Sequence, residues 1–237
     1  MPHFIGIQGN LGAGKSTVAS TMAYYYKNVS ESRFGVEIEL FSNYYLKGSK
    51  PMESYENWYE VANAQGSIVV WDEAQMVFDS RTSLKGGQIT ATKILNYCRK
   101  LKSIQFFVSP SIDNLDTRIR GMIEVLLNVR KMGNKGIAID YFDYQAKNYG
   151  PWGKLINKRF IPASKVRQIH RLNLFDTFQI VQGFPMPMTE RDEAKFFKTL
   201  EEVHNNARKR IFGKGVNDEE SDVSFDRTES QSLQAAL

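Results

Sequence analysis

Nine consecutive residues near the N-terminus combine glycines, a lysine and two hydroxyl side chains. They are Gly9, Asn10, Leu11, Gly12, Ala13, Gly14, Lys15, Ser16 and Thr17, of which the first eight match G-x-x-x-x-G-K-[ST] without a gap. Glycine allows backbone conformations that a Cβ atom would block, so successive N–H groups can point at phosphate oxygens. We expect Lys15 to reach the β- and γ-phosphates, Ser16 to bind Mg²⁺, and Thr17 to pack or touch the α-phosphate. This phosphate loop, residues 9–17, therefore predicts binding of ATP and Mg²⁺.

An acidic pair, Asp72 and Glu73, follows the apolar residues 68–71. A buried strand of this kind would deliver its acid to the carboxyl edge of a sheet, beside the phosphate loop. There Asp72 would hold Mg²⁺, directly or through water, and Glu73 would polarise the attacking water. A carboxylate that activates water favours nucleotide hydrolysis over transfer to a small alcohol. The alternative is that Glu73 caps a helix or forms a surface ion pair.

Two further roles have candidates. The end of the strand expected at 104–109 would carry a γ-phosphate sensor, for which Ser109 is preferred to Gln105. In ring ATPases an arginine from a neighbouring subunit offsets charge in the transition state. Arg99, Arg118 and Arg120 flank the sensor strand, and Arg99 is ranked first because its helix follows the acidic pair directly. Each of these arginines could instead be an ordinary surface residue.

The framework for these residues is an alternation of short apolar runs and helical patterns. Strands are expected at 3–8, 35–41, 67–72, 104–109 and 123–130, and helices at 15–27, after Pro51, at 88–102 and at 113–121. Such alternation predicts an α/β fold in three layers, with a mostly parallel central sheet between helices.

The C-terminal part of the chain, from residue 136, is expected to be less regular. A further strand at 136–146, which could be antiparallel, precedes an irregular basic region at 147–185. Thr189 and Asp192 have capping-box spacing, and the helix that they open would pack through Phe196, Leu200, Val203, Ala207 and Ile211. We therefore divide the chain into an ATPase core at 1–185 with a basic appendage at about 144–175, a C-terminal helix at 186–212, and a disordered acidic tail at 213–237.

Composition narrows the class of protein. The single cysteine, Cys98, excludes an intramolecular disulfide framework, and the three histidines are far apart in the sequence. The N-terminus lacks the pattern of a secretory signal, and no apolar run approaches the roughly 20 residues of a membrane span. These features predict a soluble, intracellular protein. Net charge is +5, with about −4 in 213–237 and about +9 in the rest, which is compatible with an anionic partner for the body or with plain solubility.

Segments around the acidic pair and beyond it resemble the Zot-like branch of the FtsK–HerA ATPases. The matching segments are VVWDEAQMVFDSR (69–81), ILNYCRKLKSIQFFVS (94–109), IDNLDTRIR (112–120), YFDY (141–144) and LFDTFQIV (174–181). The family includes filamentous-phage assembly ATPases and is related to genome-packaging ATPases of membrane-containing icosahedral phages and archaeal viruses. The resemblance covers 1–185 and implies a hexameric motor with a RecA-like core.

This sequence departs from the family at two places. Members usually carry Thr-Gln or Ser-Gln at the end of the sensor strand, whereas this chain has Ser109-Pro110. The filamentous-phage proteins continue into a transmembrane segment and an extracytoplasmic domain, whereas this chain ends in an acidic tail. The second difference favours a packaging motor, and a capsid or membrane-associated phage protein is a possible partner.

A basic stretch at 144–175 holds seven lysines and arginines, no acidic residue, and three interleaved aromatic residues. They are Lys147, Tyr149, Trp152, Lys154, Lys158, Arg159, Phe160, Lys165, Arg167 and Arg171. Such side chains neutralise phosphates and stack bases, which suits binding of DNA of any sequence. A solvated loop or a contact to an acidic subunit would also explain them.

Three functional hypotheses follow. The leading one is a viral DNA translocase that packages a genome, with phage extrusion as the near alternative. The string GNLGAGKST also looks like the loop of deoxynucleoside kinases, but the chain lacks a tight R-x-x-x-R lid at the usual place. The third is a nucleotide-gated binding protein with negligible turnover.

Overall fold

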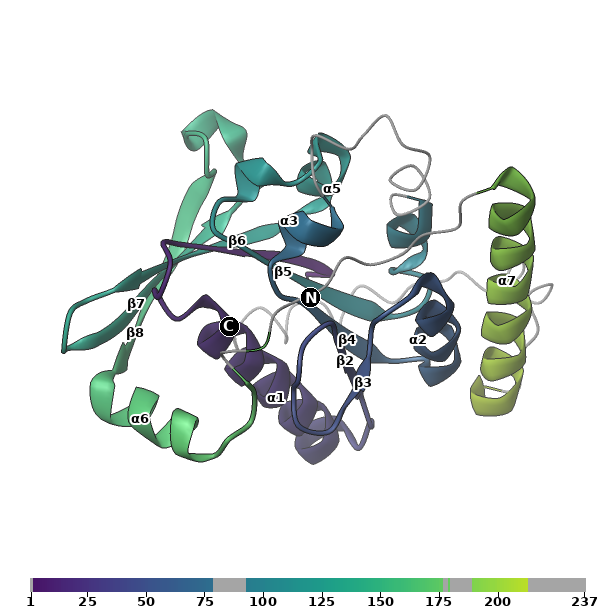
Figure 1. The fold of residues 1–237 in the computed structure, drawn as a ribbon, viewed down its shortest axis with the longest axis horizontal. Coiled ribbons are helices and arrows are strands. Elements are labelled where there is room, and N and C mark those ends of the chain that lie inside the picture. Colours follow the sequence, from purple (N-terminus) through teal and green to yellow (C-terminus); the bar gives the residue numbers. More distant parts are fainter. Residues whose placement is uncertain (1, 79–92, 177–178, 180–188, 213–237) are drawn as a thin grey trace, which may run out of the picture.

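An eight-stranded sheet forms the centre of the computed structural model, which describes residues 2–78, 93–176, 179 and 189–212 (Figure 1). The strand order is β3-β2-β4-β5-β1-β6-β7-β8. The strands are β1 (Phe4–Gln8), β2 (Glu39–Ser42), β3 (Ser49–Pro51), β4 (Ser67–Trp71), β5 (Ser103–Ser109), β6 (Val125–Lys131), β7 (Gly136–Asp143) and β8 (Lys154–Pro162). All pairings from β3 to β6 are parallel, and the β6–β7 and β7–β8 pairings are antiparallel. The sheet is thus mostly parallel, as the sequence predicted.

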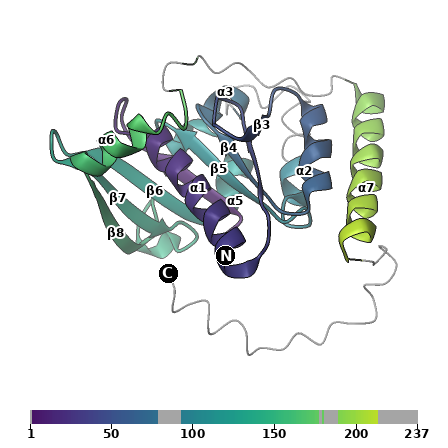
Figure 2. The ribbon, with the colours of Figure 1, turned by 90° about the horizontal axis from the view of Figure 1, so that it is seen from below.

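Helices cover both faces of this sheet. On one face, α1 (Lys15–Phe34) packs against β1, β2, β4 and β5, while α6 (Ala163–Arg171) packs against β7, β8 and α1. The opposite face is covered by α2 (Trp58–Ala64), α3 (Ala74–Val77) and α5 (Thr117–Met122), together with the helical residues 93–97. The helix α7 (Glu190–Phe212) lies against α2, outside that layer (Figure 2). Short 3₁₀ helices lie between these elements at η1 (Tyr55–Asn57), η3 (Ile112–Asn114) and η4 (Lys147–Tyr149). The three-layer α/β prediction is confirmed.

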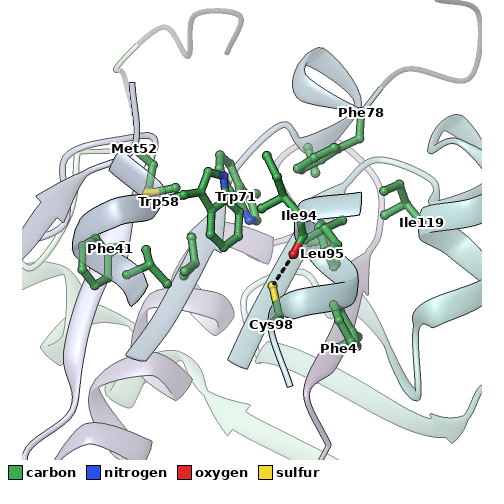
Figure 3. Close-up of a cluster of buried hydrophobic side chains, with 14 of the residues drawn as sticks. Phe4, Phe41, Met52, Trp58, Trp71, Phe78, Ile94, Leu95, Cys98 and Ile119 are labelled. Carbon is green, nitrogen blue, oxygen red and sulfur yellow. Dashed lines mark hydrogen bonds between the residues drawn. The ribbon is translucent and has the colours of Figure 1, made fainter. Parts of the chain in front are cut away.

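The apolar core on the face opposite α1 fixes the strand that carries the acidic pair. Trp71, the last residue of β4, is fully buried between Trp58 of α2 and Phe78 (Figure 3). Its indole N–H donates to Gln105 Oε1 at 2.9 Å. A buried indole needs such an acceptor, because an unpaired donor costs about 1–3 kcal/mol. Gln105 therefore has a structural partner, away from the end of its strand.

The end of one predicted helix and the predicted role of Pro51 are wrong. The helix expected at 15–27 continues to Phe34, because its left-handed C-cap is Gly35, whose N–H donates to the carbonyls of Glu31 and Ser30. The strand expected at 35–41 is accordingly shortened to β2. Pro51 does not open a helix but ends β3, which lies at the edge of the sheet, where the missing N–H of proline breaks no ladder.

The region 147–185 is also more regular than predicted. It contains η4, the edge strand β8 and the helix α6. Most residues of β8 are exposed, and α6 has no buried residue. A strand without a buried face shows no alternation of apolar and polar residues, so the sequence pattern gave no sign of it.

The predicted C-terminal helix is confirmed. Thr189 Oγ1 accepts the Asp192 N–H at 3.1 Å, and Phe196, Leu200 and Ala207 are buried. The expected disordered tail at 213–237 lies outside the described residues. Within the described residues, no helix combines the length and the apolar character that a membrane crossing requires.

Candidate nucleotide-binding site

The phosphate loop lies between the end of β1 and the start of α1, pressed against β6 and β7. Gly9 has φ 154°, and a Cβ there would lie 2.2 Å from the carbonyl oxygen of Val129 in β6. Gly14 is the left-handed N-cap of α1 with φ 93°, and its Cβ would lie 2.5 Å from Ile137 Cδ1 in β7. Glycine suits both positions, because a Cβ at residue 9 would collide with the backbone of β6, and the positive φ at residue 14 is strained for any residue with a Cβ atom.

The loop is arranged to receive an anion. Ala13 N–H closes a turn onto the carbonyl of Asn10 at 3.1 Å, and Val18 N–H donates to the Gly14 carbonyl at 2.9 Å as α1 begins. The N–H groups at the first turn and the positive end of a 20-residue helix favour negative charge here. The Lys15 ammonium donates to the Asn10 carbonyl at 3.2 Å, and the residue is only 7% exposed. Lys15 is thus held over the loop, while Leu11 at the loop tip is exposed.

The acidic pair and the phosphate loop meet, although 56 residues separate them. The Ser16 hydroxyl donates to Asp72 Oδ2 at 2.7 Å. Burial raises the pKa of the Asp72 carboxyl above its usual range, and the charge of Glu73 raises it further, while the Ser16 hydrogen bond, the Glu73 N–H and Lys15 act in the opposite direction. Two oxygen ligands on adjoining elements suit Mg²⁺, which usually takes one or two protein ligands and completes its shell with phosphates and water.

Asn43 is a residue of this site that the sequence did not suggest. It follows β2, and its side chain binds the Asp72 backbone twice, because Oδ1 accepts the Asp72 N–H at 2.7 Å and Nδ2 donates to the Asp72 carbonyl at 2.9 Å. The next residue, Tyr44, is buried and its hydroxyl lies 2.7 Å from Ser20 Oγ of α1. Asn43 therefore fixes the peptide that carries the acidic pair. A single asparagine after a strand has no distinctive pattern that could have identified it.

Glu73 has a strained backbone. Its φ of 47° and ψ of 48° lie in the left-handed region, where a residue with a Cβ atom is uncommon. Its N–H donates to Asp72 Oδ1 at 3.1 Å, and one carboxylate oxygen accepts a hydrogen bond from the Gln75 side chain. The sharp turn separates Glu73 from β4 and places it at the N-cap of α3, without a side-chain capping bond. The capping alternative for Glu73 therefore finds no hydrogen bond to support it.

Ser109 lies at the correct edge of the sheet but is otherwise engaged. It pairs with Gln8 in the β1–β5 ladder, next to the start of the phosphate loop. The residue is fully buried, and its hydroxyl donates to the Ser111 carbonyl at 2.7 Å. This bond fixes the turn after β5. The sensor role of Ser109 stays a prediction.

The three arginine candidates occupy different places. Arg99 is exposed and precedes β5, so it lies at the edge of the sheet opposite the phosphate loop. Arg118 binds Asp116 through Nε at 3.0 Å and Nη2 at 2.9 Å, and this pairing lowers the pKa of the buried Asp116 carboxyl. Arg120 pairs with the exposed Asp113 at 2.6 Å. Arg99 could reach a nucleotide only on another subunit, and its role as a finger stays a prediction.

Comparison with known proteins establishes the fold. The N-terminal domain of zonular occludens toxin from Neisseria meningitidis is similar over 74% of this chain and 100% of that domain, with 18% identity and a TM-score of 0.56. The genome packaging NTPase of Sulfolobus turreted icosahedral virus 2, in complex with ATP-gammaS, aligns over 67% of this chain and 96% of its own, with 9% identity and a TM-score of 0.43. No family model and no curated protein matches the chain. The chain therefore has the fold of the N-terminal domain of zonular occludens toxin, in agreement with the Zot-like resemblance of its sequence.

Proposed function

We propose that this protein is an ATP-hydrolysing DNA translocase that packages a viral genome. The observation that carries the proposal is the hydrogen bond of 2.7 Å between Ser16 and Asp72, which joins the phosphate loop to the acidic pair. Glu73 follows at once in a strained turn. Strain in a backbone that the surrounding contacts fix is a feature of functional sites.

The proposed hydrolysis assigns a task to each residue. The loop N–H groups, α1 and Lys15 would hold the triphosphate, while Ser16 and Asp72 would hold Mg²⁺, which neutralises charge on the phosphates when bound. Asn43 fixes the Asp72 peptide, so the carboxylate needs little reorganisation. Glu73 would accept a proton from water as the water attacks the γ-phosphate. The Gln75 side chain keeps the Glu73 carboxylate in position through a hydrogen bond.

The proposed DNA contact is the open face of β7 and β8, which is the face opposite α6. Strand alternation places Lys158 and Phe160 of β8 on this face, beside Asp140 and Ala138 of β7. Phe160 is 52% exposed, and Lys158 is exposed too. A cation beside an exposed aromatic ring suits the backbone and bases of DNA without reading its sequence. As ring ATPases do, the motor would act as a homo-oligomer, for which we propose a hexamer.

The test is the rate of ATP hydrolysis by the full chain under three conditions. These are protein alone, protein with duplex or single-stranded DNA, and protein with a mixture of deoxynucleosides. Glu73→Gln serves as the matched control, because it keeps size and removes the carboxylate. A rate that DNA raises, and that Glu73→Gln abolishes, is the expected result.

The other outcomes identify the alternatives. Phosphorylation of deoxynucleosides without stimulation by DNA would establish a kinase. A tight ATP complex with no turnover under any condition would establish a nucleotide-gated binding protein. Packaging and extrusion would both show ATP hydrolysis that DNA stimulates. Hydrolysis that also depends on an empty capsid would indicate packaging, and hydrolysis that depends on a membrane would indicate extrusion.

A further inference from the structure

A cavity of about 320 Å³ opens beside the phosphate loop, on its α6 side. Three elements far apart in the sequence line it. The phosphate loop and α1 contribute Gly12, Ala13, Gly14 and Thr17, the segment joining β6 to β7 contributes Gly133 and Asn134, and α6 contributes Val166, Arg167 and His170. Pockets of roughly 300–1,000 Å³ hold small molecules in proteins, so the cavity has room for one at the lower end of that range.

The walls combine apolar surfaces with a polar margin. Ala13, Ile137, Ala163 and Val166 supply aliphatic groups, of which Ala13 and Ile137 are buried. Asn134 can donate and accept hydrogen bonds, and Lys131 and Arg167 supply positive charge. An apolar slot with a few polar groups suits a flat heterocycle attached to a sugar.

Specific contacts hold the three elements together. The Ala163 N–H at the start of α6 donates to the Lys135 carbonyl at 2.9 Å, which ties α6 to the β6–β7 turn. Gly136 allows the close approach of β7 and β8, because a Cβ there would lie 2.1 Å from the Ile161 carbonyl oxygen. Across the cavity, His170 Nε2 of α6 lies 3.5 Å from Thr17 Oγ1 of α1. The cavity is therefore built by the fold and not left by a single loop.

We propose that this cavity binds the nucleoside part of the nucleoside triphosphate, with α6 as its outer wall. The inference rests on the proposed function, since it places the triphosphate in the phosphate loop. Gly12, Ala13, Gly14 and Thr17 belong both to the loop and to the cavity, so a molecule in one continues directly into the other. Val166 covers the base, and His170 meets the nucleotide where Thr17 faces the α-phosphate.

This placement divides the basic stretch by function. In the sequence, 144–175 is one basic stretch for which DNA is one candidate partner. In the structure, Val166, Arg167 and His170 line the cavity beside the phosphate loop. Lys158 and Phe160 are on the other face of the sheet, because β7 and β8 lie between them and α6. The α6 half thus serves the nucleotide and the β8 half remains for DNA.

The experiment measures by calorimetry the affinity of the full chain for two ligands. These are a non-hydrolysable ATP analogue and inorganic tripolyphosphate, each in the presence of Mg²⁺. Val166→Ser has a matched control in Ile169→Ser, since both residues are half-buried aliphatics of α6 but only Val166 lines the cavity. His170→Ala has a control in Gln168→Ala, which is exposed on the same helix. Thermal unfolding verifies that every variant is folded.

We expect Val166→Ser and His170→Ala to lower the affinity for the ATP analogue about fivefold or more, because apolar and polar contacts are lost. The affinity for tripolyphosphate should stay unchanged. The two controls should bind both ligands like the wild type. Equal losses for the two ligands, or losses as large in the controls, would overturn the cavity assignment. Because the experiment needs neither hydrolysis nor DNA, absence of stimulation by DNA in the wild type would refute the motor and leave this inference standing.

Discussion

The phosphate loop and the basic stretch differ in how closely their sequence prescribes their surroundings. In the loop, nine consecutive residues together form the proposed phosphate site. Gly9 and Gly14 lie so close to β6 and β7 that a Cβ atom there would contact residues of these strands. In the basic stretch, neighbours in sequence serve opposite faces of the sheet, because successive residues of β8 point in opposite directions. A contiguous sequence pattern therefore identifies the phosphate loop, whereas the sequence describes the basic stretch only by its composition.

The largest effect is expected for Asp72→Asn, which should lower ATP hydrolysis about a hundredfold or more, because a metal ligand in the transition state is worth several kcal/mol. The same change should stabilise the nucleotide-free protein. The folded-state pKa of Asp72 is raised above the unfolded value of 3.8, so proton binding stabilises the fold below pH 3.8 and this contribution is lost as pH rises through the folded pKa. At neutral pH the buried carboxylate opposes folding, and asparagine removes that cost.

Phosphate release and thermal unfolding without nucleotide measure the two effects of Asp72→Asn. The unfolding scan is repeated across the acid range, where the difference between wild type and variant should shrink as pH falls. A variant less stable than the wild type at pH 7 would show that the carboxylate stabilises the resting fold. The phosphate loop would then depend on the acidic pair for its stability.

A smaller effect is expected for Asn43→Ala, which removes both bonds to the Asp72 backbone. Loss of a group that positions a metal ligand typically costs about 10–100-fold in activity. The turnover number should fall, while affinity for the ATP analogue without Mg²⁺ stays close to that of the wild type. Asn43→Asp restores the acceptor for the Asp72 N–H and should recover part of the rate. If both variants act like the wild type, the clamp has no part in catalysis.

On the open face, Phe160→Ala should weaken DNA binding about tenfold, since stacking on one aromatic ring is worth about 1–3 kcal/mol per base. Lys158→Ala should lower the slope of log affinity against log salt by about 1, because one phosphate contact is lost. Neither change should alter affinity for the ATP analogue. DNA binding is measured by anisotropy at several salt concentrations, with Lys165→Ala of α6 as control. A larger loss in the control would place DNA on the α6 side.

The smallest effect concerns the strain at Glu73. Glycine adopts the left-handed conformation freely, whereas any residue with a Cβ atom pays about 1 kcal/mol there. Glu73→Gly should therefore be more stable than Glu73→Ala by about 1 kcal/mol in denaturant unfolding, although glycine is usually the less stable choice in folded segments. Both variants should lack hydrolysis. Greater stability of the alanine variant would show that the turn relaxes when the carboxylate is removed.

The parts of the fold that the sequence predicted have strong local patterns. The buried strands β1, β4 and β5 are short apolar runs, and α7 shows both a capping box and a helical stripe of core residues. The parts that it missed contribute no fully buried residue to the core. Neither the edge strand β8 nor the helix α6 has a buried residue, so no run of core residues marked them. Pro51 was misplaced because a helix start and an edge strand tolerate proline equally well.

The sequence by itself determined the phosphate loop, the acidic pair and the α/β class, because each depends on residues adjacent in the chain. Only the tertiary structure decided which distant residues join them. Asn43 meets Asp72 because parallel pairing of β2 with β4 brings the ends of both strands to one edge. His170 meets Thr17 because α6 packs beside α1 on the same face of the sheet. Such meetings depend on strand order and helix packing, and no spacing within the chain encodes them.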